Sequence, residues 1–361
     1  MRHCGVVVRA VVWALALVSR TGVLRAQTPP DMQIRVGLYA QVHTEASSLG
    51  TAQDGRVFME IQRARPRVEL TLNDWVHAVV EPDFGQNRAR LRNAYIGFDV
   101  TDAVTIRMGQ FKKPFALIQR TSSSVVPLIQ RGVRIAGLEE RVETRGEPVT
   151  LPDGSALIAD EQTLLDAFGY QGYAVGAALA LTAGRLELEA GVFEGPTGGA
   201  ETGGRRGGAA ARAAAVVASD VRIGTSLSHS RLAFAEEARD GTAGSVELAW
   251  SDPGKGGPGL YTEGVFGRGV GTGTDFAGGQ MMAWLHLPVG GRFTGVEPLL
   301  RASYGDPDVD ESDDGGLLFS AGVNLYMGGR NRLMVNWDVY TAQDERIGTE
   351  GALRAQAQVR F

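Results

Sequence analysis

The feature that most constrains this chain is an alternation of apolar and polar residues that recurs from residue 33 to the last residue. Near the end, for example, Leu333, Val335 and Trp337 alternate with Asn336 and Asp338. A period of two is typical of a β-strand with one apolar and one polar face. Sixteen such segments can be counted, at 33–44, 57–72, 75–84, 88–99, 103–111, 167–182, 185–194, 208–219, 221–234, 243–251, 258–269, 276–288, 293–304, 315–327, 332–342 and 352–361. Most are close to the ~9–11 residues that a tilted strand needs to cross a membrane.

Alternation alone fits both a soluble β-sandwich and a membrane-spanning barrel. The connections favour the barrel, because short turns rich in Gly, Asn and Asp at one end alternate with mostly longer connections at the other. The segment count is even, and the chain ends in Phe361 with Val359 two residues earlier, which resembles the last strand of outer-membrane barrels. No run of 18 apolar residues follows the N-terminal region, which excludes a helical membrane protein. We therefore expect an all-β, antiparallel transmembrane β-barrel of about sixteen strands.

The N-terminus reads as a secretory signal. Arg2 and Arg9 precede a short apolar stretch, and residues 24–26 end in an alanine suited to cleavage. We expect a cleaved signal peptide at 1–26, a barrel domain at 27–361 and location in the cell outer membrane; the alternative is a buried N-terminal strand. The single cysteine, Cys4, lies inside this signal, so the expected mature chain has no disulfide, thiol catalyst or Cys-ligated metal.

The charge composition points away from nucleic acid and toward anions. The formal net charge is −5, which argues against a nucleic-acid partner bound by bulk basic charge. Only three of the 36 basic residues are Lys, at 112, 113 and 255. Arg presents a planar fork of donors that suits oxyanions, although a bias of the genome would also explain its excess.

Three arginines share one face of a predicted strand. Arg63, Arg65 and Arg67 lie opposite apolar residues, so they would point into the lumen about 7 Å apart. This spacing suits a row of anion sites; the alternative is structural pairing with acids, namely Glu60, Glu69, Glu81 and Asp83. Arg107 also lies on a polar face, opposite Ile106 and Met108.

A second arginine set, at 88, 90 and 92, conflicts with this pattern. These residues share parity with Ala94 and Ile96, which look lipid-facing. A β-bulge near Asn93 would turn the arginines inward. Otherwise they lie above the membrane on an extended hairpin.

The longest connection, 112–166, follows the fifth predicted strand. It begins with Lys112 and Lys113 and continues through Arg131 and Arg134. A long excursion from a compact barrel is usually functional or disordered. We expect this third external loop to fold into the lumen and narrow it, and the alternative is a mobile surface loop.

The same region carries a family resemblance. The motifs at 63–65, 81–85, 93–97, 109–115 and 121–124 (Arg-Ala-Arg, Glu-Pro-Asp-Phe-Gly, Asn-Ala-Tyr-Ile-Gly, Gly-Gln-Phe-Lys-Lys-Pro-Phe and Thr-Ser-Ser-Ser) resemble the phosphate-selective porin O and P family in order and spacing. The resemblance covers about a fifth of the chain. It implies a sixteen-stranded outer-membrane barrel, usually trimeric, that carries anions or polyphosphates passively. The chain reads Gln130-Arg131-Gly132 where the family commonly has Glu-Arg-Ser.

Other chemistry finds little support in the sequence. The glycines at 267–273 lack the Lys-Ser/Thr of a phosphate loop, and the histidines have no metal-ligand spacing. The acidic stretch 306–314 reads as a solvated loop, with calcium binding as the less favoured alternative. We therefore expect no cofactor, no metal and no enzymatic activity.

The expected function is passive diffusion of small anions through an outer-membrane porin, with phosphate and polyphosphate as the candidate solutes. The predicted pore-lining residues are Arg63, Arg65, Arg67, Arg107, Lys112, Lys113, Arg131 and Arg134. Expected partners are small anionic solutes, outer-membrane lipid and two further copies of the chain in a homotrimer. The alternatives are a structural or adhesive surface barrel with a closed lumen and a soluble periplasmic sandwich that binds saccharide.

Overall fold

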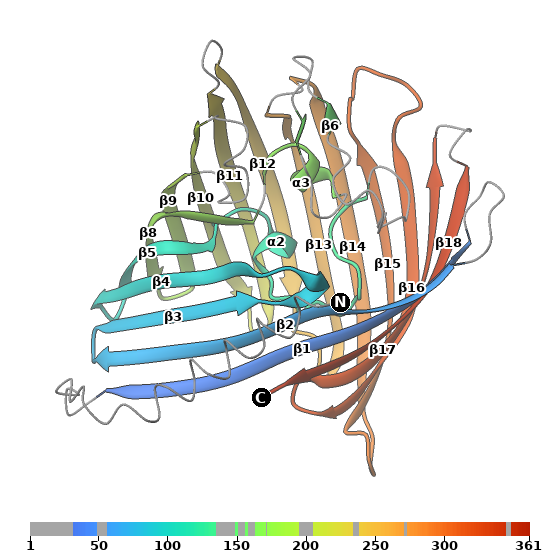
Figure 1. Cartoon of the computed structure of the whole chain (residues 1–361), viewed down its shortest axis with the longest axis horizontal. Helices are drawn as coiled ribbons and strands as arrows, with labels where there is room; N and C mark the ends of the chain where they lie inside the picture. Colours follow the sequence, from blue (N-terminus) through green and yellow to red (C-terminus); the bar gives the residue numbers. More distant parts are fainter. Residues whose placement is uncertain are drawn as a thin grey trace, which may run out of the picture.

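Sixteen antiparallel strands form a closed barrel in the computed structural model of the chain (Figure 1). The structure describes residues 32–48, 56–134, 149–150, 156–157, 163–170, 172–194, 205–233, 238–270, 273–343 and 348–361. The barrel strands are β1 (Gln33–Ser48), β2 (Arg56–Asn73), β3 (Val76–Asp83), β4 (Arg90–Thr101), β5 (Val104–Lys112), β8 (Tyr173–Ala183), β9 (Leu186–Glu194), β10 (Arg205–Ala218), β11 (Val221–Ala233), β12 (Ala238–Trp250), β13 (Gly257–Arg268), β14 (Asp275–Pro288), β15 (Gly295–Asp306), β16 (Gly316–Gly328), β17 (Asn331–Ala342) and β18 (Thr349–Arg360). Each strand pairs with its neighbours in the chain, and β1 pairs with β18 to close the barrel.

Every segment expected from the alternation corresponds to one of these strands, and most ends agree within a few residues. The largest error concerns the predicted strand 167–182. Its first residues belong to helix α3 (Leu164–Ala167) and a following turn, and β8 starts only at Tyr173. The expected signal peptide, 1–26, lies outside the described residues.

The barrel buries its polar face and exposes its apolar face. On β17, Arg332, Asn336 and Asp338 are each 1% exposed, whereas Val335 and Trp337 are 42% and 54% exposed. A soluble sandwich would bury the apolar face instead, so the saccharide-binding sandwich considered from sequence is wrong. An exposed apolar band around a polar interior is the arrangement of barrels that lie in lipid.

Short turns connect the strands at one end of the barrel. Between β2 and β3 the Asn73 side chain accepts the backbone N–H of Val76 at 2.8 Å, and between β4 and β5 the Thr101 hydroxyl accepts that of Val104 at 3.1 Å. Side chains of this kind bond their own backbone and stabilise tight turns. At the barrel seam, Leu38 and Phe361 exchange two backbone hydrogen bonds of 3.0 and 3.1 Å, which extends closure to the last residue.

The long connection between β5 and β8 is partly described. It contains α2 (Leu117–Arg120), the two-residue strands β6 (Val149–Thr150) and β7 (Ala156–Leu157), and α3. We call residues 113–134 the strap. The strap ends in a β-bridge between Arg134 and Thr163, which joins it to the segment that leads through α3 into β8.

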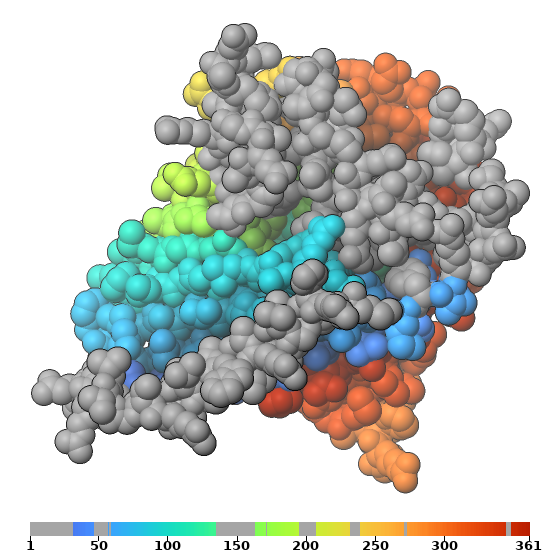
Figure 2. Space-filling view, in the orientation of Figure 1, coloured from blue at the N-terminus to red at the C-terminus, as the bar shows by residue number. Residues whose placement is uncertain are grey.

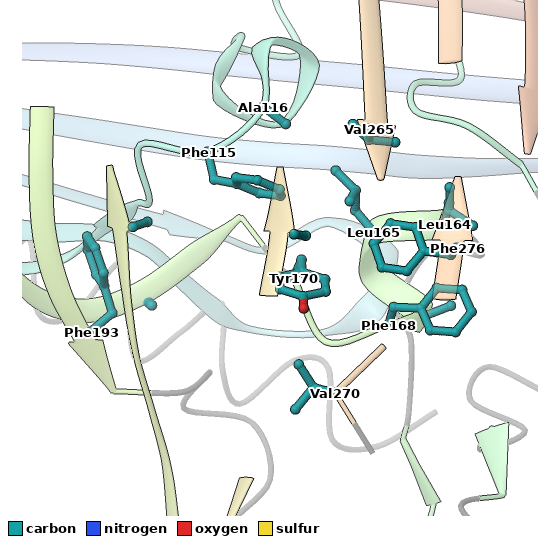
Figure 3. Close-up of a cluster of buried hydrophobic side chains, with 14 of the residues drawn as sticks. Phe115, Ala116, Leu164, Leu165, Phe168, Tyr170, Phe193, Val265, Val270 and Phe276 are labelled. Atoms are coloured by element: carbon teal, nitrogen blue, oxygen red, sulfur yellow. The ribbon is translucent and has the colours of Figure 1, made fainter. Parts of the chain in front are cut away.

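An apolar core anchors both ends of this connection to the barrel wall (Figure 3). Phe115 from the strap lies near Tyr170, and Phe168 stacks on Phe276 of β14 with ring centroids 4.8 Å apart. Small inward residues of the wall, such as Ala174 and Ala210, leave room for these rings. In the described part of the chain, no helix has the length and apolar character needed to cross a membrane.

Candidate anion pathway

Much of the strap packs against the inner face of the wall from β11 to β18. Its apolar side chains, among them Leu117 and Ile118, contact Tyr261, Met282 and Trp284 on β13 and β14. Its backbone also donates hydrogen bonds to this wall. Ala116 donates to Ser226 Oγ at 3.0 Å, Ile118 to Glu263 Oε2 at 2.7 Å and Ile129 to Asn336 Oδ1 at 2.8 Å.

The wall in turn donates hydrogen bonds to carbonyls of the strap. Arg301 donates to Gln130 O at 3.0 Å, and Asn324 donates to Pro127 O at 2.9 Å. Arg332 donates to Val126 O at 2.6 Å, and Gln358 donates to Ser124 O at 3.1 Å. The donors come from β15 to β18, so this wall holds the strap at many points. Hydrogen bonds from charged donors are stronger than those between neutral groups, so Arg301 and Arg332 hold the strap to this wall more firmly than the two amides do. We call these two arginines the fasteners of the strap.

Five cationic side chains gather where the wall of β2–β5 meets the strap. The Lys112 ammonium at the end of β5 interacts electrostatically with four guanidinium groups, those of Arg63, Arg65, Arg92 and Arg131. We call these five residues the cationic cluster. Figure 2 shows part of the β2–β5 wall, from blue to cyan, on one face of the molecule.

Two guanidinium groups of the cationic cluster share one acid. Arg65 donates to Asp83 Oδ2 at 2.7 Å, and Arg92 approaches the same oxygen at 3.4 Å. Asp83 therefore serves two guanidinium groups. Arg63 donates to two neutral oxygens, those of the Gln41 and Gln62 side chains, both at 2.7 Å.

Two register shifts bring these arginines to the inner face. On β2 the pairing with β1 skips Gln62, and on β4 the pairing with β3 skips Arg92. A bulge of this kind inserts one unpaired residue and reverses the parity of the strand beyond it. The bulge at Arg92 is adjacent to Asn93, which confirms the bulge expected from the parity conflict. Leu91 now faces outward, 46% exposed, while Arg92 reaches Asp83 inside.

A short turn also packs against the first bulge. The 3₁₀ turn η1 (Gly85–Asn87) connects β3 to β4 and lies directly on β2. A Cβ on Gly85 would be only 2.1 Å from the backbone oxygen of Gln62, so only glycine fits at this position. Close packing of η1 keeps the β2 bulge, and hence Arg63, in place.

The strap contributes Arg131 and holds Lys112. Lys112 donates from Nζ to Thr121 O at 2.9 Å, and Arg131 donates to Ile118 O at 2.7 Å and to Gln119 O at 3.1 Å. Tyrosine rings support the cations from the wall. Tyr173 has Arg92 at 5.4 Å and Lys112 at 5.5 Å from its centroid. Cations over aromatic faces are attracted by the ring quadrupole.

The remaining predicted residues lie in different surroundings. Arg67 donates to Glu69 at 2.6 Å and to Glu81 at 3.0 Å, as the structural alternative expected. Arg107 pairs with Glu189 and lies over the Phe111 ring. Lys113 and Arg134, at 9% and 1% exposure, are buried at the two ends of the strap. The structure therefore brings four of the eight predicted residues, Arg63, Arg65, Lys112 and Arg131, into one cluster.

Sequence reasoning missed several inner residues. Arg92 was excluded from the predicted pore-lining set because of the parity conflict, and Tyr173 was assigned to an ordinary strand. It also missed an ion network across the seam, in which Arg354 joins Glu45 and Asp338. The signal was present, since Arg354 lies on the polar face of the last predicted strand, but its partners are far away in the sequence.

With this geometry described, comparisons with known proteins assign the family. The family model for phosphate-selective porin O and P matches residues 36–249, which is more than half of the chain. The chain belongs to this porin family. It is an outer-membrane porin, and its family and fold are those of channels. No curated protein sequence matches it.

Solved structures of porins share the fold. An anion-selective porin from Comamonas acidovorans has a TM-score of 0.62 at 13% identity, covering 92% of this chain and 100% of that one. The OmpF porin of Salmonella typhi, solved with daunomycin, has a TM-score of 0.61 at 10% identity, with 91% and 97% covered. The DcaP channel of Acinetobacter baumannii has a TM-score of 0.55 at 10% identity and the same coverage. At these identities the similarity establishes the barrel fold alone.

Proposed function

We propose that this porin passes small oxyanions, phosphate among them, along the cationic cluster. The observation that carries this proposal is the gathering of Lys112 with four guanidinium groups, two of which share the single acid Asp83. A local excess of positive charge in a low-dielectric wall attracts anions even when the whole protein is negative. Guanidinium forks add bidentate hydrogen bonds for oxyanions.

The strap defines where this pathway runs. Because it packs against β11–β18, we propose that it narrows the lumen and directs solutes toward the β2–β5 wall. Support comes from the hydrogen bonds of Val126, Pro127 and Gln130 to the far wall. The inward-folding loop expected from sequence remains a prediction for the connection as a whole, because residues 135–148 lie outside the described part.

Reversal potentials in a salt gradient test the anion pathway. In planar bilayers with a potassium phosphate or chloride gradient, we expect anion preference, and we expect Arg65→Ala to reduce it severalfold because Asp83 then adds negative charge. Arg185→Ala, in the exposed turn between β8 and β9, is the matched control and should behave as the wild type. Cation preference in the wild type, or a ratio unaffected by Arg65→Ala, would refute the proposal. A complete lack of conductance would instead favour the closed structural barrel.

We also propose the assembly and processing expected from the sequence. The chain forms a homotrimer in outer-membrane lipid after removal of residues 1–26. The exposed apolar band supports the lipid partner, and one similar structure, an outer-membrane protein of Vibrio cholerae with a TM-score of 0.52, is titled as a trimer form. Light scattering of the detergent-solubilised protein and the mass of its mature chain test both points. A monomeric mass or an intact N-terminus would contradict them.

A further inference from the structure

Two buried glutamates face each other on neighbouring strands beneath the strap. Glu247 of β12 is directly opposite Glu263 of β13 in the strand register. They are 8% and 5% exposed. Side chains in such opposed positions have Cβ atoms about 4.5–5.5 Å apart, so the two carboxyl groups are within reach of each other.

Among the residues that the structure describes, only Glu247 of this pair has a cationic partner. Arg212 of β10 binds Glu247 through Oε1, with its Nε at 2.8 Å. In the part of the chain that the structure describes, Glu263 forms no ion pair and accepts the backbone N–H of Ile118. The second oxygen of Glu247, Oε2, is buried and has no hydrogen-bond partner among the described residues.

This arrangement is unfavourable if both carboxyl groups are ionised. A buried charge without a counter-charge is costly, and a like charge on the opposite strand adds repulsion. A buried acceptor without a donor adds a further cost. A single proton removes all three problems, because neutral Glu263 can donate an O–H to the vacant Oε2 of Glu247.

We propose that Glu247 and Glu263 share one proton in the folded barrel at neutral pH, and that this carboxyl pair is a proton-binding site under α2. The bond is O–H···O⁻ between the two side chains. Glu247 stays ionised and paired with Arg212. Glu263 stays neutral, and its other oxygen accepts the backbone N–H of Ile118. The proton comes from solvent and returns to it when the site titrates.

The other groups around the pair agree with this assignment. Facing Glu263 from β14 is Gln280, which does not titrate. On β13 itself, Tyr261 occupies the next inward position and bonds Asp252 at 3.1 Å. From the strap, Arg120 acts on Glu247 but pairs with Glu189 at 2.8 Å. From β9, Glu187 approaches Arg212 at 3.5 Å and adds no positive charge.

Loss of the proton has a consequence for transport. It places an extra negative charge next to the strap, and repulsion between the carboxylates loosens the wall that anchors Ile118. Anion preference should therefore fall measurably at alkaline pH, because the interior of the barrel gains one negative charge. This transport effect rests on the proposed anion function, whereas the shared proton itself does not.

Infrared spectroscopy of the folded barrel in detergent tests the proton directly. We expect the C=O stretch of a protonated carboxylic acid at pH 7, its loss on raising the pH while the barrel stays folded, and its absence in Glu263→Gln. The variant should fold, because the amide can donate an N–H to Glu247 in place of the O–H. Glu189→Gln is the matched control: this glutamate pairs with Arg107 and Arg120, so its removal should leave the band unchanged.

Three results would overturn the assignment. The first is a wild-type spectrum without the band at pH 7, and the second is a band that persists in Glu263→Gln. The third is a barrel that added Ca²⁺ stabilises only while Glu263 is present, since that would assign a metal ion to the pair. Should the variant fail to assemble, the pH titration of the wild type still decides. Because none of these readouts measures transport, failure of the anion pathway leaves them interpretable.

Discussion

Charged residues inside this barrel bond both to acids and to neutral groups. Arg354 donates to Glu45 at 2.7 Å and also bonds Asp338, and all three side chains are almost fully buried. This network joins β1, β17 and β18 at the seam. In the cationic cluster, Arg65 and Arg92 share Asp83, and Arg63 also donates to two neutral side-chain oxygens. Pairing therefore stabilises the seam, and the proposed anion pathway lies where the five cations gather.

Removing the shared cation of the seam should destabilise the barrel strongly. Arg354→Met preserves much of the side-chain volume but leaves the buried Glu45 without its cation, which typically costs about 3–5 kcal/mol. Reversible urea unfolding in lipid vesicles measures the change. Lys255→Met is the control, because Lys255 and Asp252 form an exposed pair worth at most about 1 kcal/mol. Equal losses of unfolding free energy in the two variants would show that burial does not increase the contribution of the network to stability.

At the scale of elements, the strap is defined by its partners rather than by its own secondary structure. Apart from the four residues of α2 it has no regular structure among its described residues, yet side chains of β5 and of the β11–β18 wall form hydrogen bonds with its backbone. The sequence predicted strands well because alternation is a local signal. It failed at the start of the predicted strand 167–182, where helix α3 and an apolar core interrupt the pattern. The strap's contacts were not predictable, because Val126 and Arg332 are 206 residues apart.

Loss of one fastener should make the strap less rigid. Arg332→Met removes the 2.6 Å bond to Val126 O, and we expect noisier single-channel currents and a larger mean conductance as the strap moves. Single-channel recording in planar bilayers measures both quantities.

Arg222→Met provides the same chemical change without this effect. Arg222 lies on β11 and pairs with Glu187 at 3.4 Å. Its currents should resemble those of the wild type. If Arg332→Met were as quiet as this control, the fastening role of Arg332 would be wrong.

At the scale of the whole molecule, the barrel exposes its apolar side chains and buries its polar ones, the reverse of a soluble protein. Apolar side chains such as Val36 and Leu300 are 73% and 53% exposed, while Arg301 is 1% exposed. Both the strand count and the orientation of the two faces followed from sequence alternation together with connection lengths. The half of the lumen in which the strap lies did not follow, because that depends on long-range contacts.

An outward charge at mid-strand should disturb membrane insertion. Leu300→Arg, near the centre of β15, is expected to lower the free energy of unfolding in lipid by about 2–4 kcal/mol, the cost of a cation facing the bilayer midplane. Leu300→Phe should change it little. Urea unfolding in vesicles, followed by tryptophan fluorescence, measures both variants. If Leu300→Arg left the free energy of unfolding unchanged, this face would be covered by something other than acyl chains.

The hydrogen bonds between the strap and the C-terminal strands also bear on the order in which the barrel assembles. Ser124 accepts a hydrogen bond from Arg360, the penultimate residue, at 2.7 Å, so the two ends of that bond are 236 residues apart. Contacts of such high sequence separation form late, because the intervening chain must first be organised. The attachment of the strap can therefore be completed only after the C-terminal hairpin has joined the sheet. A chain truncated before β17 would lack both the closing seam and the donors Arg332, Gln358 and Arg360, so its strap would have none of these three anchors.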